Sequence, residues 1–135
     1  MHFLKRKINM ELSLQILPYD LSICHAPPHA DLPLLSIESA FLSVTKTPEE
    51  LSVICESQCV PKGLKCESGW AAIRVVGPLD LSLIGILADL SSLLAEADIS
   101  IFAISTYETD ILLIKSEMVP EARKVLETRH TILGG

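Results

Sequence analysis

The residues with the clearest capacity for chemistry follow a predicted strand, in the turn from Gly77 to Gly85. Such a turn, leading into a helix, presents unpaired backbone N–H groups and the positive end of the helix dipole, which suit a carboxylate. Gly77 lets the backbone bend, and Pro78 fixes its direction. Asp80 and Ser82 stand where a helix N-cap belongs, and capping explains either one. Alternatively, the Asp80 carboxylate pairs with the ammonium group of a ligand.

Gly85 needs a reason of its own, because glycine in the first turn of a helix costs about 1 kcal/mol relative to alanine. Close approach of a ligand or another backbone is one reason, and close packing of the helix on the sheet is the other. Ile84, Ile104 and Ile111 could line an apolar wall beside this turn, although core packing accounts for each of them as well.

A second polar group, Ser105, Thr106, Thr109 and Asp110, ends two apolar segments. We expect a hairpin here whose polar tip returns toward the turn at residue 77. Hairpin chemistry alone explains most of these residue types, since Thr and Asp are ordinary tip residues.

Catalysis and metal binding have little support. No Ser, His and Asp set resembles a nucleophile elbow, and no glycine loop with a lysine could cradle phosphate. His2, His25, His29 and His130 fall in loops or at element ends, where solvated side chains are expected. The four cysteines, Cys24, Cys55, Cys59 and Cys66, lack the spacing of a zinc knuckle. We therefore expect reduced thiols, with no metal, no cofactor, no disulfide and no catalytic residue.

Composition narrows the class of protein further. The 135 residues carry a net charge of −6. From Glu11 onward the chain has 8 of its 11 basic residues and all 17 acidic ones, a balance that argues against nucleic acid as a partner. Residues 79–97 are the longest apolar tract, but three acidic residues make this tract too costly for a membrane span. Residues 1–10 lack a secretory signal and are expected to be a disordered arm or an upstream start. These features favour a cytoplasmic protein.

Periodicity predicts the elements that position the turn and the hairpin. In the second half, strands at 70–76, 99–105, 111–114 and 131–133 alternate with helices at 82–97 and 116–129. This order is that of a ferredoxin-like βαββαβ unit. The first half has strands near 11–17, 21–24, 38–45 and 51–55, with a single helical turn begun by Thr47-Pro48-Glu49-Glu50. The polar stretch 61–69 reads as a loop between the halves.

The stretches 77–88 (GPLDLSLIGILA) and 94–110 (LAEADISIFAISTYETD) resemble the ACT-domain family, as found in small bacterial paired-ACT proteins, aspartate-kinase regulatory regions and the animal cytosolic arginine sensor. Residues 41–55 are similar to the segment that precedes this motif. Two departures from the family pattern are Ile111, where a tyrosine is usual, and Asp98, where a glycine is usual. The first removes an aromatic ring near the hairpin, and the second alters the helix end.

This resemblance implies an α+β fold of two ferredoxin-like ACT units, the first degenerate over residues 11–66 and the second regular over residues 67–135. It also implies a regulatory module that binds an amino acid or similar small ligand between ACT units, paired within the chain or in a homodimer. A ligand-free interaction protein is the alternative. The candidate ligand-binding residues are Gly77, Pro78, Leu79, Asp80, Ser82, Ile84, Gly85, Ile104, Ser105, Thr106 and Asp110.

Overall fold

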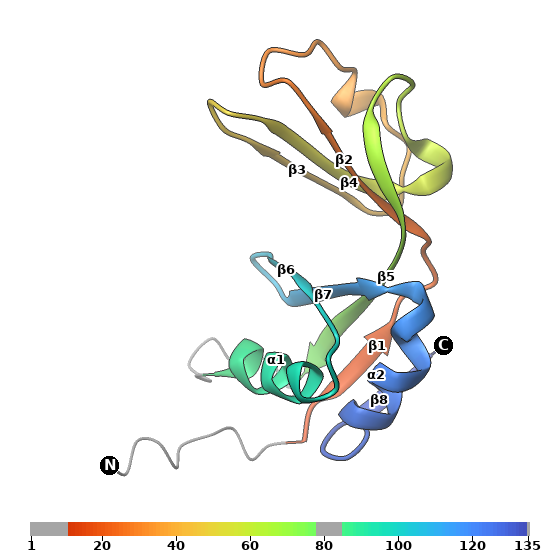
Figure 1. The fold of residues 1–135 in the computed structure, drawn as a ribbon, viewed down its shortest axis with the longest axis vertical. Coiled ribbons are helices and arrows are strands. Elements are labelled where there is room, and N and C mark those ends of the chain that lie inside the picture. The colour runs from red at the N-terminus through yellow and green to blue at the C-terminus, as the bar shows by residue number, and fades with distance from the viewer. Residues whose placement is uncertain (1–10, 78–84, 135) are drawn as a thin grey trace. The chain divides into compact units, whose positions relative to one another are not determined.

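The computed structural model describes residues 11–77 and 85–134, and the contacts among them form two units. The C-terminal unit contains residues 11–18 together with 71–134, and the N-terminal unit contains residues 19–70. One strand, β5 (Lys65–Gly77), belongs to both units: its first residues are in the N-terminal unit and its last residues are in the C-terminal unit. Each unit is described below by itself (Figure 1).

The C-terminal unit is a sheet with two helices. Its strands are β1 (Ser13–Ile16), the end of β5, β6 (Phe102–Ser105), β7 (Asp110–Lys115) and β8 (Thr131–Leu133). Their order is β6-β7-β5-β1-β8, with β1 antiparallel to β5 and parallel to β8. The helices α1 (Ile86–Glu96) and α2 (Val119–Leu126) both pack on one face of this sheet (Figure 1).

The core of this unit fills the space between the helices and the sheet. Alternate strand residues point into it because side chains of a strand alternate between faces. Leu14, Leu112 and Leu126 are fully buried there, and each such leucine contributes about 1.5–3 kcal/mol by leaving water. The buried members are Leu12, Leu14, Ala71, Ile73, Val75, Ile86, Leu90, Leu93, Leu94, Ile99, Leu112, Ile114, Ala122 and Leu126.

The N-terminal unit contains no α-helix in its residues, 19–70, all of which the structure describes. Its strands are β2 (Leu21–Ala26), β3 (Leu42–Lys46), β4 (Leu51–Glu56) and the beginning of β5. They are ordered β3-β4-β2-β5, and every neighbouring pair is antiparallel. A small core of Ala26, Leu51, Val53 and Cys55 is covered by irregular segments and two short 3-10 turns, Leu34–Ser36 and Ser57–Cys59.

The α+β fold class and the strand pattern are confirmed, but three local predictions are wrong. Residues 47–50 form no helical turn: the Thr47 hydroxyl accepts the N–H groups of Glu49 and Glu50 at 3.2 Å within the hairpin that joins β3 to β4. Ser116 does not cap α2, which begins at Val119 after a 3-10 turn. Residues 65–69 belong to β5 rather than to a loop, because they pair with β2.

The observed division of the chain also differs from the predicted boundaries. Residues 11–66 were expected to form one half, yet β1 pairs with β5 and β8 and so belongs to the C-terminal unit. Strand β1 lies between these two strands, where Leu14 is fully buried. The physical reason is that a strand in the middle of a sheet needs backbone partners on both sides.

Helix α1 ends in a Schellman motif centred on Asp98. The Asp98 N–H donates to the Ala95 carbonyl at 3.0 Å, and the Ile99 N–H donates to the Leu94 carbonyl at 2.9 Å. Asp98 itself has a φ of 58°, the left-handed region in which glycine is favoured. The replacement of the family's glycine therefore leaves the helix end intact while straining one residue.

We expect Asp98→Gly to raise the free energy of unfolding by about 0.5–1 kcal/mol, because it relieves the positive φ and removes a negative charge from a helix C-terminus. Urea denaturation measures the change. Asp98→Asn is the matched control, since it removes the charge and keeps the side chain's shape. A glycine variant no more stable than the asparagine variant would contradict the assignment of strain.

Candidate functional site

Five predicted ligand-binding residues, Pro78, Leu79, Asp80, Ser82 and Ile84, lie outside the described residues. The two glycines that flank them are described. Gly77 is the last residue of β5, and Gly85 directly precedes the first residue of α1. The candidate turn therefore leads from a central strand of the C-terminal unit into the amino end of α1.

Gly85 meets a backbone requirement that was not predicted from the sequence. It lies at the N-cap position of α1 rather than in the first turn, with a φ of 87°. A Cβ atom added there would meet no atom within 4 Å, so neither close packing nor close approach by a described residue requires glycine. The left-handed backbone requires it, because residues with a Cβ rarely adopt that conformation. The Gly85 carbonyl then accepts the Asp89 N–H at 2.8 Å, which starts the helix.

The polar residues at the end of β6 and the start of β7 bond one another. The Ser105 hydroxyl donates to the Asp110 carboxylate at 2.6 Å, and these two residues are direct cross-strand partners. The Thr106 N–H and hydroxyl both bond the Thr109 carbonyl, at 2.8 and 3.0 Å. The hairpin predicted from residue types is thus present, and its tip is internally hydrogen-bonded.

One side-chain bond fixes the hairpin tip against β5. The Thr109 hydroxyl donates to the Val75 carbonyl at 2.6 Å, and Val75 is two residues before Gly77. Strand β7 also pairs with β5 along the sheet. The structure therefore brings Ser105, Asp110 and the end of β5 into one region. This agrees with the prediction that the hairpin tip returns toward residue 77.

The apolar candidates near this tip form a cross-strand pair. Ile104 on β6 lies opposite Ile111 on β7, which is 6% exposed. Ile104 is half-buried. Because Ile111 replaces the family's tyrosine, an aliphatic side chain occupies this buried position next to Asp110.

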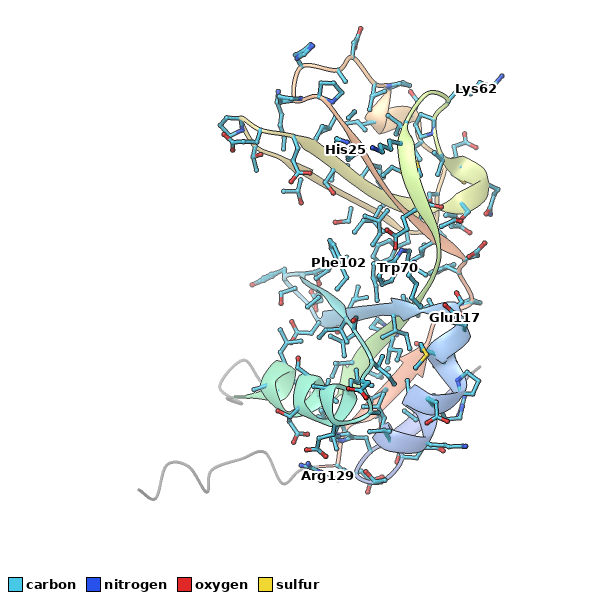
Figure 2. The ribbon with its side chains drawn as sticks, viewed as in Figure 1. His25, Lys62, Trp70, Phe102, Glu117 and Arg129 are labelled. Atoms are coloured by element: carbon cyan, nitrogen blue, oxygen red, sulfur yellow. A yellow bond between two sulfur atoms is a disulfide. The ribbon has the colours of Figure 1, made fainter. Side chains whose placement is uncertain are left out.

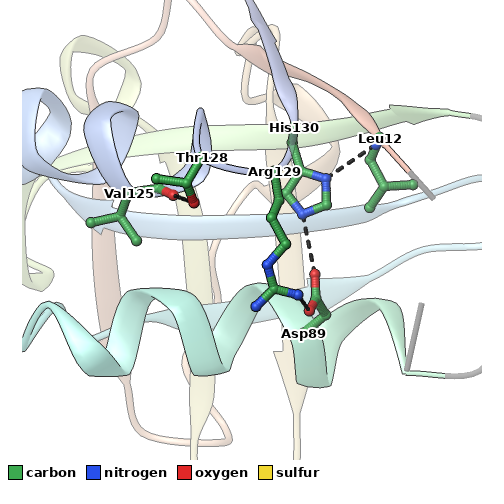
Figure 3. Close-up of polar contacts among 6 residues, drawn as sticks. All are labelled: Leu12, Asp89, Val125, Thr128, Arg129 and His130. Atoms are coloured by element: carbon green, nitrogen blue, oxygen red, sulfur yellow. Dashed lines mark hydrogen bonds and ion pairs between the residues drawn. The ribbon is translucent and has the colours of Figure 1, made fainter. Parts of the chain in front are cut away.

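The C-terminal unit contains a buried polar network that was not predicted from the sequence (Figure 3). Asp89 on α1 bonds Arg129 Nη1 at 2.6 Å and His130 Nε2 at 3.1 Å, both from the segment between α2 and β8. His130 Nδ1 accepts the Leu12 N–H at 3.1 Å. His130 is 5% exposed, so the prediction of a solvated histidine is wrong. A carboxylate on the apolar face of α1 was the signal that such a partner existed.

The hydrogen bonds of the network assign the tautomer of His130 and argue against a catalytic role for it. A backbone N–H can only donate, so Nδ1 must be unprotonated, and the ring proton must sit on Nε2 and point at Asp89. Both ring nitrogens are occupied, which leaves none to take a proton from a substrate. The histidine instead ties α1 to the beginning of β1.

The cysteines depart from expectation in one respect. Cys24 and Cys66 form a disulfide between β2 and β5, so the prediction of four reduced thiols is wrong. Spacing could not reveal it, since the bond joins residues 42 apart in sequence that become neighbours only through strand pairing. Cys55 and Cys59 are free. No group of three or more His, Cys, Asp or Glu side chains among the described residues could hold a metal ion.

The two free thiols differ in environment. Burial raises the pKa of the Cys55 thiol, and the nearby Cys59 and Glu56 raise it further. The Cys59 thiol is half-buried, donates to the Glu38 carbonyl at 3.3 Å, and lines an open hollow of about 480 Å³ in the N-terminal unit. None of the predicted ligand-binding residues lines this hollow.

Comparison with known proteins agrees with this geometry. An ACT-domain family model matches residues 65–128. The human protein CASTOR3P is 27% identical over 106 residues, which cover 69% of this chain and 65% of that protein. Protein Atu0741 from Agrobacterium tumefaciens is 27% identical in sequence, covers 92% of this chain and 93% of its own, and superposes with a TM-score of 0.84.

A more distant match shares the fold alone. The regulatory subunit of aspartate kinase from Thermus thermophilus is 14% identical, covers 82% of this chain and 93% of its own, and gives a TM-score of 0.59. Residues 65–128 therefore resemble the ACT-domain family, and the chain shares the fold of an aspartate-kinase regulatory subunit. The chain spans 65% of the length of its human relative. No described helix is long and apolar enough to cross a membrane.

His130→Ala is expected to lower the free energy of unfolding by about 3 kcal/mol, because it leaves the Leu12 N–H and part of the Asp89 carboxylate buried without partners. Arg129→Ala should cost about 1 kcal/mol or less, since the arginine side chain is 46% exposed and water replaces its bond. Urea unfolding measures both, with Thr128→Ala on the exposed neighbour as control. Equal losses for the two variants would show that the shorter ion pair, rather than the histidine, holds the network.

Thiol labelling should separate Cys59 from Cys55. The raised pKa of Cys55 keeps it protonated at neutral pH, and the thiolate is the reactive form, so iodoacetamide should label Cys59 first. Raising the pH toward the pKa of Cys55 should narrow the difference between the labelling rates of the two thiols. Mass spectrometry of the non-reduced protein measures both rates, and equal labelling at neutral pH would contradict the burial of Cys55.

Proposed function

We propose that this protein is a non-catalytic regulatory module that binds an amino acid at an interface between ACT units. The observation that carries the proposal is the match of residues 65–128 to the ACT-domain family, together with the bond from the Thr109 hydroxyl to the Val75 carbonyl, which holds the β6–β7 tip beside the end of β5. The polar tip is thereby held beside the strand that leads into the candidate turn.

The charges of an amino acid suit the groups assembled there. The amino end of α1 offers N–H groups and a positive dipole end for the ligand's carboxylate. The Asp80 carboxylate is proposed to pair with the ligand's ammonium group, and Ser105 and Asp110 supply further hydrogen-bonding groups. The pair Ile104 and Ile111 is proposed to contact the ligand's side chain.

The absence of catalysis is part of this proposal. His130 has both ring nitrogens occupied, and the threonine and serine groups at the β6–β7 tip bond neighbouring protein atoms. We further propose that the protein is cytoplasmic and pairs ACT units within the chain or as a homodimer. Its acidic balance after residue 10 argues against nucleic acid as a partner.

A second function, a ligand-free interaction protein that regulates a partner enzyme, is favoured by one observation. The Ser105 hydroxyl is already engaged by Asp110 at 2.6 Å, and Thr106 by Thr109, so the tip satisfies much of its own hydrogen bonding. A ligand would have to replace these hydrogen bonds, or bind to polar groups of the tip that are not already hydrogen-bonded.

Titration calorimetry of the full chain against the twenty amino acids at millimolar concentration tests the proposal. We expect one amino acid, or a small chemically related set, to bind. Asp80→Ala and Ser105→Ala should each weaken binding by about tenfold, equivalent to about 1.4 kcal/mol.

Ser92→Ala, on an exposed position of α1, is the matched control and should leave the affinity unchanged. If no amino acid binds at millimolar concentration, the sensor function fails and the ligand-free alternative stands. Binding that survives both site substitutions unchanged would keep the function and refute the proposed site.

A further inference from the structure

All four cysteines lie in the N-terminal unit, and two of them join neighbouring strands. Cys24 on β2 and Cys66 on β5 are direct register partners and form a disulfide. Cys24 is 1% exposed, whereas Cys66 is an exposed residue. Cys66 is therefore the more exposed residue of the pair, and Cys24 is the buried one.

The disulfide lies where the sheet of this unit is held least by backbone pairing. Strand β2 meets β4 through six consecutive register pairs, but it meets β5 through four, with an irregularity between Leu21 and Ile23. Gly69 on β5 has a φ of 84°, the conformation of a glycine at a β-bulge. In the N-terminal unit β5 is an edge strand, and its first residues pair with β2, to which the disulfide also links them.

The segment ahead of β5 covers the core of the same unit. Val60 and Leu64 pack against the core cluster of Ala26, Leu51, Val53 and Cys55. Lys62 lies at the turn of this segment, and His25 lies on β2 across from the start of β5 (Figure 2). A unit as short as residues 19–70 gains from additional restraint, because the core of a small unit contributes little free energy. The cross-link supplies it by holding the end of this segment to β2.

We propose that the Cys24–Cys66 disulfide is a reversible redox switch that controls the order of residues 60–67. When the bond is oxidised, the start of β5 stays on β2 and the segment with Val60 and Leu64 covers the core. When the bond is reduced, residues 60–67 open locally while the β2–β4 and β3–β4 ladders persist. This device acts in the N-terminal unit and is independent of the proposed ligand site.

The direction of the exchange follows from the exposure of the two cysteine residues. A thiolate of glutathione or of a dithiol reductant attacks Sγ of the more exposed residue, Cys66, forming a mixed disulfide and releasing Cys24 Sγ, which takes up a proton. A second reductant thiolate attacks the reductant's sulfur in that mixed disulfide, releasing Cys66 as a thiol and the reductant as a disulfide. The protein gains two electrons and two protons, and the two reductant thiols lose them. Glutathione disulfide reverses both steps.

The free thiols do not take part in this exchange. Burial raises the pKa of Cys55 and keeps it a protonated thiol, which is a poor nucleophile. The Cys59 Sγ donates to the Glu38 carbonyl, away from the strand pair. Cys59→Ser is therefore a matched control for the loss of one thiol in the same unit.

The test is hydrogen exchange of the full chain, equilibrated in glutathione buffers from fully oxidising to fully reducing, with mass spectrometry of the alkylated cysteines in the same samples. We expect Cys24 and Cys66 to pass together from disulfide to thiols. Exchange of the amides in residues 60–67 should quicken by about tenfold on reduction, while the amides of β7 stay protected.

The double variant Cys24→Ser with Cys66→Ser should exchange quickly at residues 60–67 in every buffer, and Cys59→Ser should switch like the unsubstituted protein. Four free thiols in oxidising buffer, or unchanged exchange at residues 60–67 after full reduction, would overturn the proposal. A disulfide that persists in excess reduced glutathione would show that the proposed switch is not reversible. The readout needs no ligand, so failure of the proposed function leaves this result intact.

Discussion

Hydrogen bonding of the β5 backbone is the constraint on which both units depend. The backbone N–H and C=O groups of a buried strand need hydrogen-bond partners, and β5 finds different partners along its length. Its first residues pair with β2 in the N-terminal unit, and its last residues pair with β1 and β7 in the C-terminal unit. This requirement is met in the C-terminal sheet by residues 13–16, which pair with β5 on one side and β8 on the other.

The same pairing positions the candidate site. Because β7 lies beside β5, Thr109 reaches the Val75 carbonyl and the β6–β7 tip is held near Gly77. The amino end of α1 is restrained separately, because Asp89 begins the helical bonding to Gly85 and is itself fixed by His130. A buried polar network of this kind stabilises one arrangement only when every member is bonded, as Leu12, His130 and Asp89 are. The candidate site therefore lies between two restrained elements.

Local patterns in the sequence predicted much of the fold. Alternation of apolar residues located β1, the hairpin pattern with its returning apolar run located β7, and the apolar spacing of α1 located that helix. The Thr-Pro-Glu-Glu pattern at residues 47–50 failed because a threonine hydroxyl can accept the same N–H groups in a hairpin as at a helix start. Local sequence cannot separate these two cases without knowledge of the strand pairing.

The remaining errors involve partners distant in sequence. His130 meets Asp89, 41 residues away, and Cys24 meets Cys66, 42 residues away, so neither contact has a local signal. Of the candidate site, the hairpin residues were predicted correctly as a hairpin, because turn chemistry is local. The role of Gly85 was not, because a positive φ depends on how the chain enters α1.

The central claim is that an amino acid binds where the end of β5, the start of α1 and the β6–β7 tip converge. Backbone chemical-shift mapping by NMR, with the best-binding amino acid added to the labelled full chain, tests it most directly. The account predicts saturable shifts at Gly77, Gly85 and residues 105–110, with the amides of β3 and β4 unperturbed. Shifts confined to the N-terminal unit, or none at saturating amino acid, would contradict it.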